Sequence, residues 1–228
     1  MTAIVIAHRG ASGYELENSL AAFRAAGAMR ADAVELDVHA TADGVLVVHH
    51  DETLDGRHPI AHQDGVAVRA HRLPNGEPVP TLQESLEAVG PRLGAFVEVK
   101  GLAPRFDDVL LDALDHGPNP GAYAVHGFDH RIVRRLGSRR PALRRGVLSA
   151  SYLLRPLAAL EDAGATDLWQ ERRLVDQSLV DQVHGAGGRV IAWTVDEPEE
   201  LRLLLAMGVD AICTNLPDVG RRVVDSAT

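Results

Sequence analysis

The stretch Val34-Glu35-Leu36-Asp37-Val38 carries two carboxylates on an otherwise apolar segment. Successive side chains of a β-strand point to opposite faces, so Glu35 and Asp37 project together from a strand whose other residues belong in a packed layer. Two buried carboxylates repel each other unless a cation or a shared proton relieves the repulsion. The stretch alone therefore indicates either a cation site or an ordinary ion pair with one Lys or Arg.

The residues that follow this strand predict a hairpin. Asp43-Gly44 lies between extended segments, and Asp-Gly is the strongest short-range signal for a tight turn between antiparallel strands. A second strand over residues 45–49 would return the segment His49-His50-Asp51 to about the level of Asp37. Because side chains alternate, we expect only one of the two histidines to face the carboxylates.

Short apolar runs alternate with helical patterns along the chain. Besides the hairpin strand, the sequence predicts eight strands, each followed by a helix: residues 3–7, 33–38, 95–100, 122–126, 146–149, 166–169, 189–195 and 210–214. Repeated strand–helix units imply parallel strands with right-handed crossovers. Eight such units in 228 residues predict a closed (β/α)₈ or TIM barrel with an extra β-hairpin after the second strand. An open doubly wound sheet fits less well, because no Gly-rich dinucleotide-binding turn follows the first strand.

We expect a single domain over residues 1–228. Residues 52–80 are rich in Gly, Pro, Asn, His and Asp and show no periodicity, which predicts a loop without secondary structure inserted near the active-site rim. Thr81-Leu82-Gln83-Glu84 is a capping box and predicts that a helix begins there.

The composition excludes several classes of function. Thirty-two acidic and 23 basic residues give a formal charge of −9, which leaves no electrostatic footprint for nucleic acid or anionic lipid. We interpret the arginines between residues 131 and 145 as a solvated helix face. The single cysteine, Cys213, rules out an internal disulfide, and no apolar run is long enough to span a membrane. The first residues lack the cationic flank of a signal peptide, so we expect a cytoplasmic protein. The sequence sets no oligomeric state.

In a TIM barrel the active site lies at the carboxyl ends of the strands. The polar or aromatic residues at these ends are His8, Arg9, Glu35, Asp37, Glu98, Lys100, His126 and Trp193, to which the hairpin adds His50. Three carboxylates suit Mg²⁺ or Ca²⁺, and an Arg and a Lys beside a metal suit an oxyanion such as phosphate. Two histidines could serve as acid and base, which makes zinc ligation by them a weaker alternative. His39, on the same face as Asp37, is a further candidate contact to metal or phosphate.

Several short motifs accompany these residues in a fixed order. They are His8-Arg9-Gly10, Glu17-Asn18-Ser19, Glu35-x-Asp37, Asp43-Gly44, His50-Asp51, Pro80-Thr81-Leu82, Glu98-x-Lys100, Phe128-Asp129, Trp193-Thr194-Val195 and Gly208-Val209-Asp210. Each motif is weak by itself. Together they give the chain, from about residue 4 to residue 218, a resemblance to the glycerophosphodiester phosphodiesterase family.

The resemblance implies a TIM barrel that hydrolyses glycerophosphodiesters, such as glycerophosphocholine or glycerophosphoethanolamine, to glycerol 3-phosphate and an alcohol. It implies one divalent cation, Mg²⁺ or Ca²⁺, held by Glu35, Asp37 and Glu98. It implies that His8 and His50 are the general base and acid, in either order. The substrate-binding residues it implies are Arg9, Glu17, Lys100, His126 and Trp193. Attack by the substrate's own neighbouring hydroxyl, through a cyclic phosphate, is an open alternative to direct hydrolysis.

The chain departs from the family pattern at three places. Leu16 replaces the usual proline before Glu17-Asn18, Gly127 stands where a serine is common, and Gly56-Arg57-His58-Pro59 replaces the usual arginine and threonines. These positions belong to the pocket wall and so bear on the choice of substrate. Two other functions stay open: a lysophospholipase D-like phosphodiesterase acting on lipids, and a non-catalytic barrel that binds phosphorylated ligands.

Overall fold

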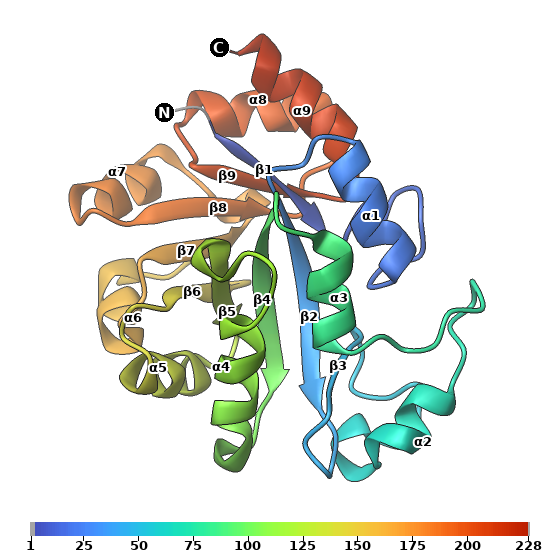
Figure 1. The fold of residues 1–228 in the computed structure, drawn as a ribbon. Helices are drawn as coiled ribbons and strands as arrows, with labels where there is room; N and C mark the ends of the chain where they lie inside the picture. The colour runs from blue at the N-terminus through green and yellow to red at the C-terminus, as the bar shows by residue number, and fades with distance from the viewer. Residues whose placement is uncertain (1–2, 228) are drawn as a thin grey trace.

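The parallel strands close into a barrel. The structure is a computed structural model that describes residues 3–227, so the predicted domain limits, 1 and 228, lie outside the described residues. Eight strands form the ring: β1 (Ile4–His8), β2 (Ala33–Ala40), β4 (Gly94–Gly101), β5 (Tyr123–Gly127), β6 (Arg144–Ser149), β7 (Asp167–Glu171), β8 (Arg189–Trp193) and β9 (Ala211–Thr214). Neighbouring strands pair in parallel, and pairing between β1 and β2 closes the ring (Figure 1). The predicted TIM barrel is confirmed.

The predicted hairpin is also confirmed. The amino-terminal part of β2 pairs with β1, whereas its carboxyl-terminal part pairs with the antiparallel strand β3 (Leu46–Val48) outside the ring. Gly44 takes the left-handed backbone of the turn, with φ of 88°. Because Thr41 N–H donates to the Val45 carbonyl, the chain reverses tightly and returns toward the carboxyl end of β2.

Helices cover the outside of the barrel (Figure 1). They are α1 (Leu20–Ala28), α3 (Leu82–Val89), α4 (Asp107–Asp115), α5 (His130–Arg139), α6 (Pro156–Ala163), α7 (Gln177–Gly185), α8 (Pro198–Ala206) and α9 (Pro217–Ser226). Three-residue 3₁₀ turns η2 (Pro104–Phe106), η3 (Pro120–Ala122) and η4 (Arg172–Leu174) lie in the connections. The capping box predicted at Thr81 forms with Glu84 and begins α3. From residue 3 to residue 227, no helix has both the length and the apolar character needed to cross a membrane.

Side chains fill the interior of the barrel. Its apolar layer includes Ile6, Phe96, Trp169 and Ile191, all buried. Below this layer, at the amino-terminal end, the buried Asp167 receives hydrogen bonds from Arg144 (2.8 Å) and Arg189 (2.6 Å). The barrel is therefore closed at its floor, and the only end left open for chemistry among the described strands is the carboxyl end.

The expectation that residues 52–80 lack secondary structure is wrong. The segment contains the 3₁₀ turn η1 (Ile60–His62) and the helix α2 (Gly65–Ala70), which lie beside β3 and away from the ring (Figure 1). Its apolar side chains form a small buried cluster with a residue of β3: Val47, Ile60, Val68, Leu73 and Val79. Because these residues are unevenly spaced among glycines and prolines, no periodicity reveals them.

The interpretation of the arginine run as a solvated face is also wrong in part. Helix α5 lies against the acidic helix α4, and the Arg135 guanidinium bonds both carboxylate oxygens of the buried Asp107, at 2.8 and 2.9 Å. Arg139 pairs with Asp108 in the same way. Much of the run is therefore paired within the fold.

Candidate active site

Three buried carboxylates face the carboxyl end of the barrel. Glu35 and Asp37 project from β2, and Glu98 projects from β4, opposite Asp37 in the parallel register. The ammonium of Lys100 lies 2.7 Å from Glu98 Oε1 and 2.9 Å from Asp37 Oδ1. The Nε of Arg9 lies 3.1 Å from the second oxygen of Asp37. Two neighbouring strands and the loop after β1 thus create a cluster of three carboxylates and two cations.

Two residues with a left-handed backbone hold this cluster. Arg9, with φ of 56°, donates its backbone N–H to Glu35 Oε2 at 3.1 Å. Asn18, with φ of 55°, donates its side-chain N–H to Asp37 Oδ2 at 2.8 Å. The left-handed region costs a non-glycine residue roughly 1–2 kcal/mol. Here the strain is offset by hydrogen bonds to buried carboxylates, as is common at functional sites.

The three carboxyl groups differ in their affinity for protons. Burial raises the pKa of Glu35 well above its ordinary value, and the charges of Asp37 and Glu98 raise it further. Burial raises the pKa of Glu98 to about 7, although Lys100 opposes the shift. For Asp37 burial acts in the same direction, but the attraction of Lys100 and Arg9 exceeds it and lowers the pKa. Glu35 and Glu98 are therefore the groups that gain most from an added cation.

The donor set fits a divalent cation. Glu35, Glu98 and His126 each bring one ligand atom to within 4.8 Å of the other two. Carboxylate oxygens and an imidazole nitrogen are ordinary metal ligands. The ligand set predicted from the sequence was Glu35, Asp37 and Glu98. The two sets share Glu35 and Glu98; Asp37, the third residue of the predicted set, lies 2.9 Å from Lys100 Nζ and 3.1 Å from Arg9 Nε.

A chain of hydrogen bonds fixes the ring of His8. Its Nδ1 lies 2.7 Å from Asn215 Oδ1, and Asn215 Nδ2 donates to Asp196 at 2.6 Å. Ser12 also donates to Asn215 Oδ1, at 2.8 Å. Since a carboxylate only accepts, the amide nitrogen of Asn215 must face Asp196 and its oxygen must face His8. His8 therefore carries its hydrogen on Nδ1, and Nε2 keeps a free lone pair. Burial, and then the charge of Arg9, lower the pKa of His8 and keep the ring neutral.

The second predicted catalytic histidine is held differently. His50 follows β3, and its Nδ1 lies 2.8 Å from Asp51 Oδ1. His39, from β2, approaches the backbone carbonyl of His50 with its Nε2 at 3.3 Å. His50 lines the cavity above the carboxylates, whereas His49 does not line it. This agrees with the expectation that only one of the two histidines would face the cluster.

His126 projects from β5 and also lines this cavity. Its imidazole stacks on the indole of Trp169, with ring centroids 4.1 Å apart and planes 2° from parallel. Gly146 makes room for this stack, since a Cβ there would come within 2.7 Å of the Trp169 ring. Burial lowers the pKa of His126 to about 3, so its ring is neutral. Its Nδ1 is buried and has no hydrogen-bond partner among residues 3–227.

Two cavities open onto this cluster. The first, here called the central cavity, measures about 70 Å³ and is lined by His8, Arg9, Glu35, His50, Glu98, Lys100, His126, Phe128, Leu148, Trp169, Trp193 and Cys213. Its aromatic wall includes Trp193 and Phe128, which meet edge to face at 5.9 Å. Most of the residues predicted for catalysis, metal and substrate therefore gather in one small space.

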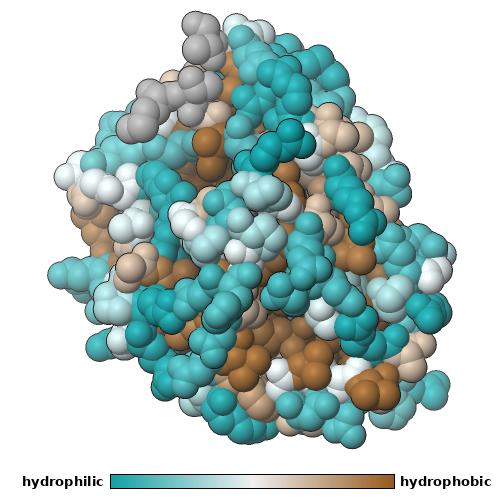
Figure 2. Space-filling view, in the orientation of Figure 1, coloured by the Kyte–Doolittle hydropathy of each residue, from teal (hydrophilic) through white to brown (hydrophobic). Residues whose placement is uncertain are grey.

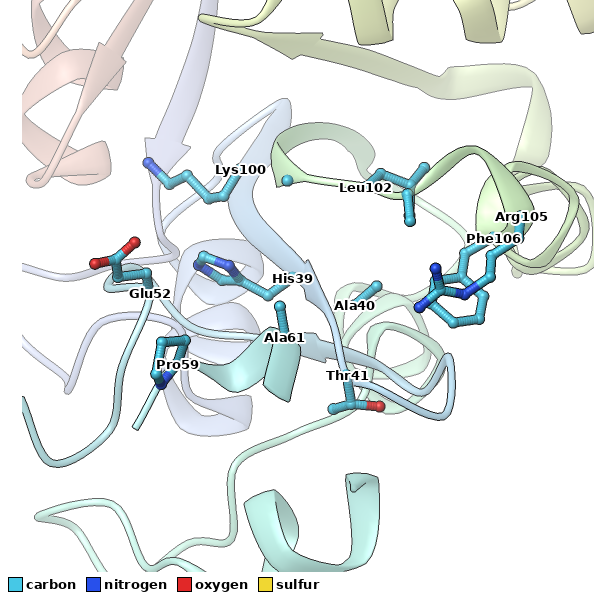
Figure 3. A pocket seen from close by; sticks show the side chains of 12 residues that line it. His39, Ala40, Thr41, Glu52, Pro59, Ala61, Lys100, Leu102, Arg105 and Phe106 are labelled. Carbon is cyan, nitrogen blue, oxygen red and sulfur yellow. The ribbon is translucent and has the colours of Figure 1, made fainter. Parts of the chain in front are cut away.

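The second cavity, here called the side cavity, measures about 340 Å³, and Lys100 lines both it and the central cavity. Figure 3 shows Lys100, His39 and Glu52 at one end, and Arg105 beside Phe106 at the other. The space between them is mainly apolar. Figure 2 shows a corresponding apolar area framed by hydrophilic residues near the ends of β2 and β4. The segment 52–80 contributes to this cavity through Glu52, among others.

One predicted substrate-binding residue lies apart from both cavities. Glu17 is half exposed and accepts a hydrogen bond from Arg9 Nη1 at 2.7 Å. Neither cavity is lined by Glu17. In the structure this residue orients Arg9, which does line the central cavity.

Three residues that hold side chains of the site in place were not predicted from the sequence. Asn215 follows β9 and holds His8; Asp51 holds His50; Asn18 holds Asp37. Asn18 and Asp51 were visible within motifs, but no pattern assigned them a role. Asn215 could have been found by extending the rule for strand ends to the last strand.

The chain is similar to known proteins over nearly its whole length. The sequence profile of the glycerophosphoryl diester phosphodiesterase family matches residues 8–219. A glycerophosphodiester phosphodiesterase of Caldanaerobacter subterraneus is 31% identical over 234 residues, covering 96% of this chain and 96% of that protein. Among solved structures, an Oleispira antarctica phosphodiesterase in complex with the product sn-glycerol-3-phosphate has a TM-score of 0.91 at 25% identity, covering 97% of this chain and 96% of that one. A glycerophosphodiester phosphodiesterase of Parabacteroides distasonis has a TM-score of 0.88 at 26% identity, covering 99% and 98%.

Fold and matches together define a hydrolase of phosphodiesters built on a TIM barrel. The chain belongs to the glycerophosphoryl diester phosphodiesterase family, which it matches over nearly its whole length.

Proposed function

We propose that this enzyme hydrolyses small glycerophosphodiesters to glycerol 3-phosphate and an alcohol, with Glu35, Asp37 and Glu98 around a divalent cation and with His8 and His50 as base and acid. The observation that carries the proposal is the central cavity, in which both histidines, Arg9, Lys100 and two of the carboxylates line one space. The Oleispira relative, bound to sn-glycerol-3-phosphate, supports the nature of the product.

The acid–base roles follow from the partners of the two rings. His8 is neutral and has a free lone pair on Nε2, so it serves as the base that takes the proton from the attacking hydroxyl. His50, whose Nδ1 lies beside Asp51, serves as the acid that gives a proton to the oxygen of the departing alcohol. One P–O bond forms and one breaks, and exchange with water returns both rings to their starting states.

Arg9 and Lys100 neutralise the phosphate. Both line the central cavity, and both already hold Asp37, so their positions are fixed before the substrate arrives. Such preorganised charges stabilise a transition state without the cost of rearrangement. A divalent cation supplies Lewis-acid polarisation of the phosphoryl oxygens.

The side cavity is the place for the alcohol half of the substrate. Lys100 lines both cavities, and Glu52 lies near His39 at the same end of the side cavity. Of the charged side chains that line the side cavity, Lys100 and Arg105 are positive and Glu52 is negative, so a cationic amino alcohol such as choline or ethanolamine would bind beside Glu52. Neither end of this cavity offers the long apolar channel that an acyl chain would need.

A substrate panel tests the proposal. Glycerophosphocholine, glycerophosphoethanolamine, glycerophosphoglycerol and a lysophospholipid are incubated with the enzyme, and release of glycerol 3-phosphate is followed by coupled oxidation. We expect turnover of the soluble diesters, with the cationic ones preferred and this preference reduced in Glu52→Gln. Turnover of the lysophospholipid alone would favour the lipid-directed alternative. Binding of the diesters without any turnover would favour a non-catalytic barrel.

A further inference from the structure

The buried imidazole of His126, whose Nδ1 has no hydrogen-bond partner among the described residues, lies beside Glu35 and Glu98. These are the two carboxylates of the site whose pKa is raised. His126 is 1% exposed, and one of its ring nitrogens belongs to the trio whose ligand atoms lie within 4.8 Å of one another. No residue of the described chain accepts or donates a hydrogen bond at its Nδ1. A buried polar group without a partner costs about 1–3 kcal/mol, so such a group requires an explanation.

The surroundings of His126 hold its ring in one orientation. Trp169 stacks on one face at 4.1 Å, and the missing side chain of Gly146 is what allows the indole to lie there. In the strand register, His126 lies opposite Glu98 of β4 and opposite Gly146 of β6. The ring is thus placed by its neighbours beside Glu98, and no hydrogen bond competes for its nitrogen.

We propose that His126 is a ligand of the divalent cation at this site, and that the resulting mixed nitrogen–oxygen set selects a first-row transition-metal ion, such as Mn²⁺, Co²⁺ or Zn²⁺, over Ca²⁺ and Mg²⁺. This inference rests on the proposed function only in locating the cation between Glu35 and Glu98. Imidazole binds transition-metal ions well, whereas Ca²⁺ and Mg²⁺ prefer oxygen ligands. The preference therefore depends on this one side chain.

This role differs from the one expected from the sequence, which was contact with substrate. The ring of His126 lines the central cavity and stacks on Trp169, so ligation of a metal is a second role for the same side chain. Asp37, expected as the third ligand, has Lys100 and Arg9 within 2.9 and 3.1 Å. A nitrogen ligand beside Glu35 and Glu98 therefore adds to the carboxylate set of the proposed function.

The test uses the full-length protein, stripped of metal with a chelator that is then removed. Calorimetric titration with Mn²⁺, Co²⁺, Zn²⁺, Mg²⁺ and Ca²⁺ gives the order of affinities. Pulsed electron paramagnetic resonance of the Mn²⁺ form then reports directly whether an imidazole nitrogen is coordinated. The variant is His126→Gln, which keeps a polar side chain of similar length under Trp169. His39→Gln is the matched control, because His39 lies on the same rim but outside the trio.

We expect the transition-metal ions to bind more tightly than Ca²⁺ and Mg²⁺, with a nitrogen signal in the wild type and in His39→Gln. In His126→Gln the signal disappears and affinity for Mn²⁺ and Co²⁺ falls roughly tenfold or more, the range seen when groups that support a metal site are removed. Affinity for Ca²⁺ changes little. A nitrogen signal that persists in His126→Gln, or its absence from the wild type, would overturn the proposal.

Thermal unfolding keeps the test informative if the variant is less stable. A ligand that binds only the folded state raises the unfolding temperature, and the increase with Mn²⁺ can be compared between proteins that differ in basal stability. The increase should be smaller in His126→Gln than in His39→Gln. Metal bound through His126 in an enzyme that turns over no glycerophosphodiester would refute the proposed function alone. Turnover with a cation that shows no nitrogen ligand would refute this inference alone.

Discussion

The Nδ1 of His8 lies 2.7 Å from Oδ1 of Asn215, a residue 207 positions further along the chain. The two meet because β1 and β9 are neighbours in the closed ring, with Ala7 opposite Thr214. Asn215 is itself held by Asp196, so the orientation of the amide decides which nitrogen of His8 carries the hydrogen. The tautomer of His8 is therefore set by a contact that the closure of the barrel makes possible.

The variant Asn215→Ala should lower kcat by roughly 10- to 100-fold, the usual cost of losing a group that orients a functional histidine. KM should change little, because Asn215 does not line either cavity. Steady-state kinetics on a turned-over diester provide the measurement. Ser12→Ala, which removes the second donor to Asn215 and the hydroxyl contact to the His8 carbonyl but leaves Asn215 in place, is the control and should have a smaller effect. A large rise in KM with kcat preserved would show that Asn215 contacts substrate instead.

Lys100→Met should move catalysis and metal binding in opposite directions. The change removes the cation that lies 2.7 Å from Glu98 and 2.9 Å from Asp37, so both carboxylates become more available to a metal. Metal affinity, measured by calorimetry, should rise. In contrast, kcat/KM should fall roughly 10- to 100-fold, since a hydrogen bond to a charged group contributes about 1.5–3 kcal/mol. Loss of both metal affinity and activity would mean that Lys100 mainly holds the fold of the site.

Metal binding should become tighter as the pH rises from 5 to 8. Without metal, burial holds the pKa of Glu98 at about 7, above its ordinary value of 4.5, so the folded protein keeps a proton there that the metal must displace. Calorimetry in buffers of different ionisation enthalpy should detect proton release near pH 6. Affinity independent of pH across this range would contradict the raised pKa.

The same pKa has a consequence for stability. Because the folded pKa of Glu98 lies above the unfolded one, its stabilising contribution is fully present below about pH 4.5 and is lost as the pH rises through about 7. The unfolding temperature of the metal-free protein should therefore decline over this window more steeply than that of Glu98→Gln. Saturation with a divalent cation should reduce the decline. If the unfolding temperatures of the two metal-free proteins declined equally with pH, the raised pKa of Glu98 would be contradicted.

Gly146→Ala should destabilise the protein and disturb His126. The new Cβ would lie 2.7 Å from Trp169, which would have to move from its place on the imidazole. Such overpacking costs about 1–3 kcal/mol, measurable by denaturant unfolding. Gly185→Ala, where a Cβ meets no atom within 4 Å, is the control and should leave stability nearly unchanged. An equal effect of the two substitutions would show that the stack tolerates the added methyl group.

The fold could be predicted because the sequence pattern of each strand–helix unit extends over only a few neighbouring residues. The apolar runs, the Asp43-Gly44 turn and the capping box at Thr81 all act over a few residues, and the structure has each of them. The segment 52–80 could not be predicted in this way. Its helix is stabilised by contacts with Val47 of β3, and the apolar residues that make them follow no period.

Local and distant contacts likewise differ in how far they could be predicted at the candidate site. Glu35 and Asp37 share a face because of strand alternation, which a sequence displays directly. The partnership of His8 with Asn215 depends on ring closure, and the position of His126 depends on Trp169. Side-chain contacts between distant strands carry no local signal, so the sequence does not predict these two contacts.

The measurement that tests the account most directly is release of glycerol 3-phosphate from glycerophosphoethanolamine by the wild type, His8→Ala and His50→Ala. Each protein is stripped with EDTA, freed of the chelator, assayed, and assayed again after a divalent cation is restored. The proposed function predicts full activity only in the metal-restored wild type. The activity of each metal-restored variant should be lower by about 10²-fold or more, the contribution of general acid–base catalysis. Full activity in the stripped enzyme, or in either histidine variant, would contradict it.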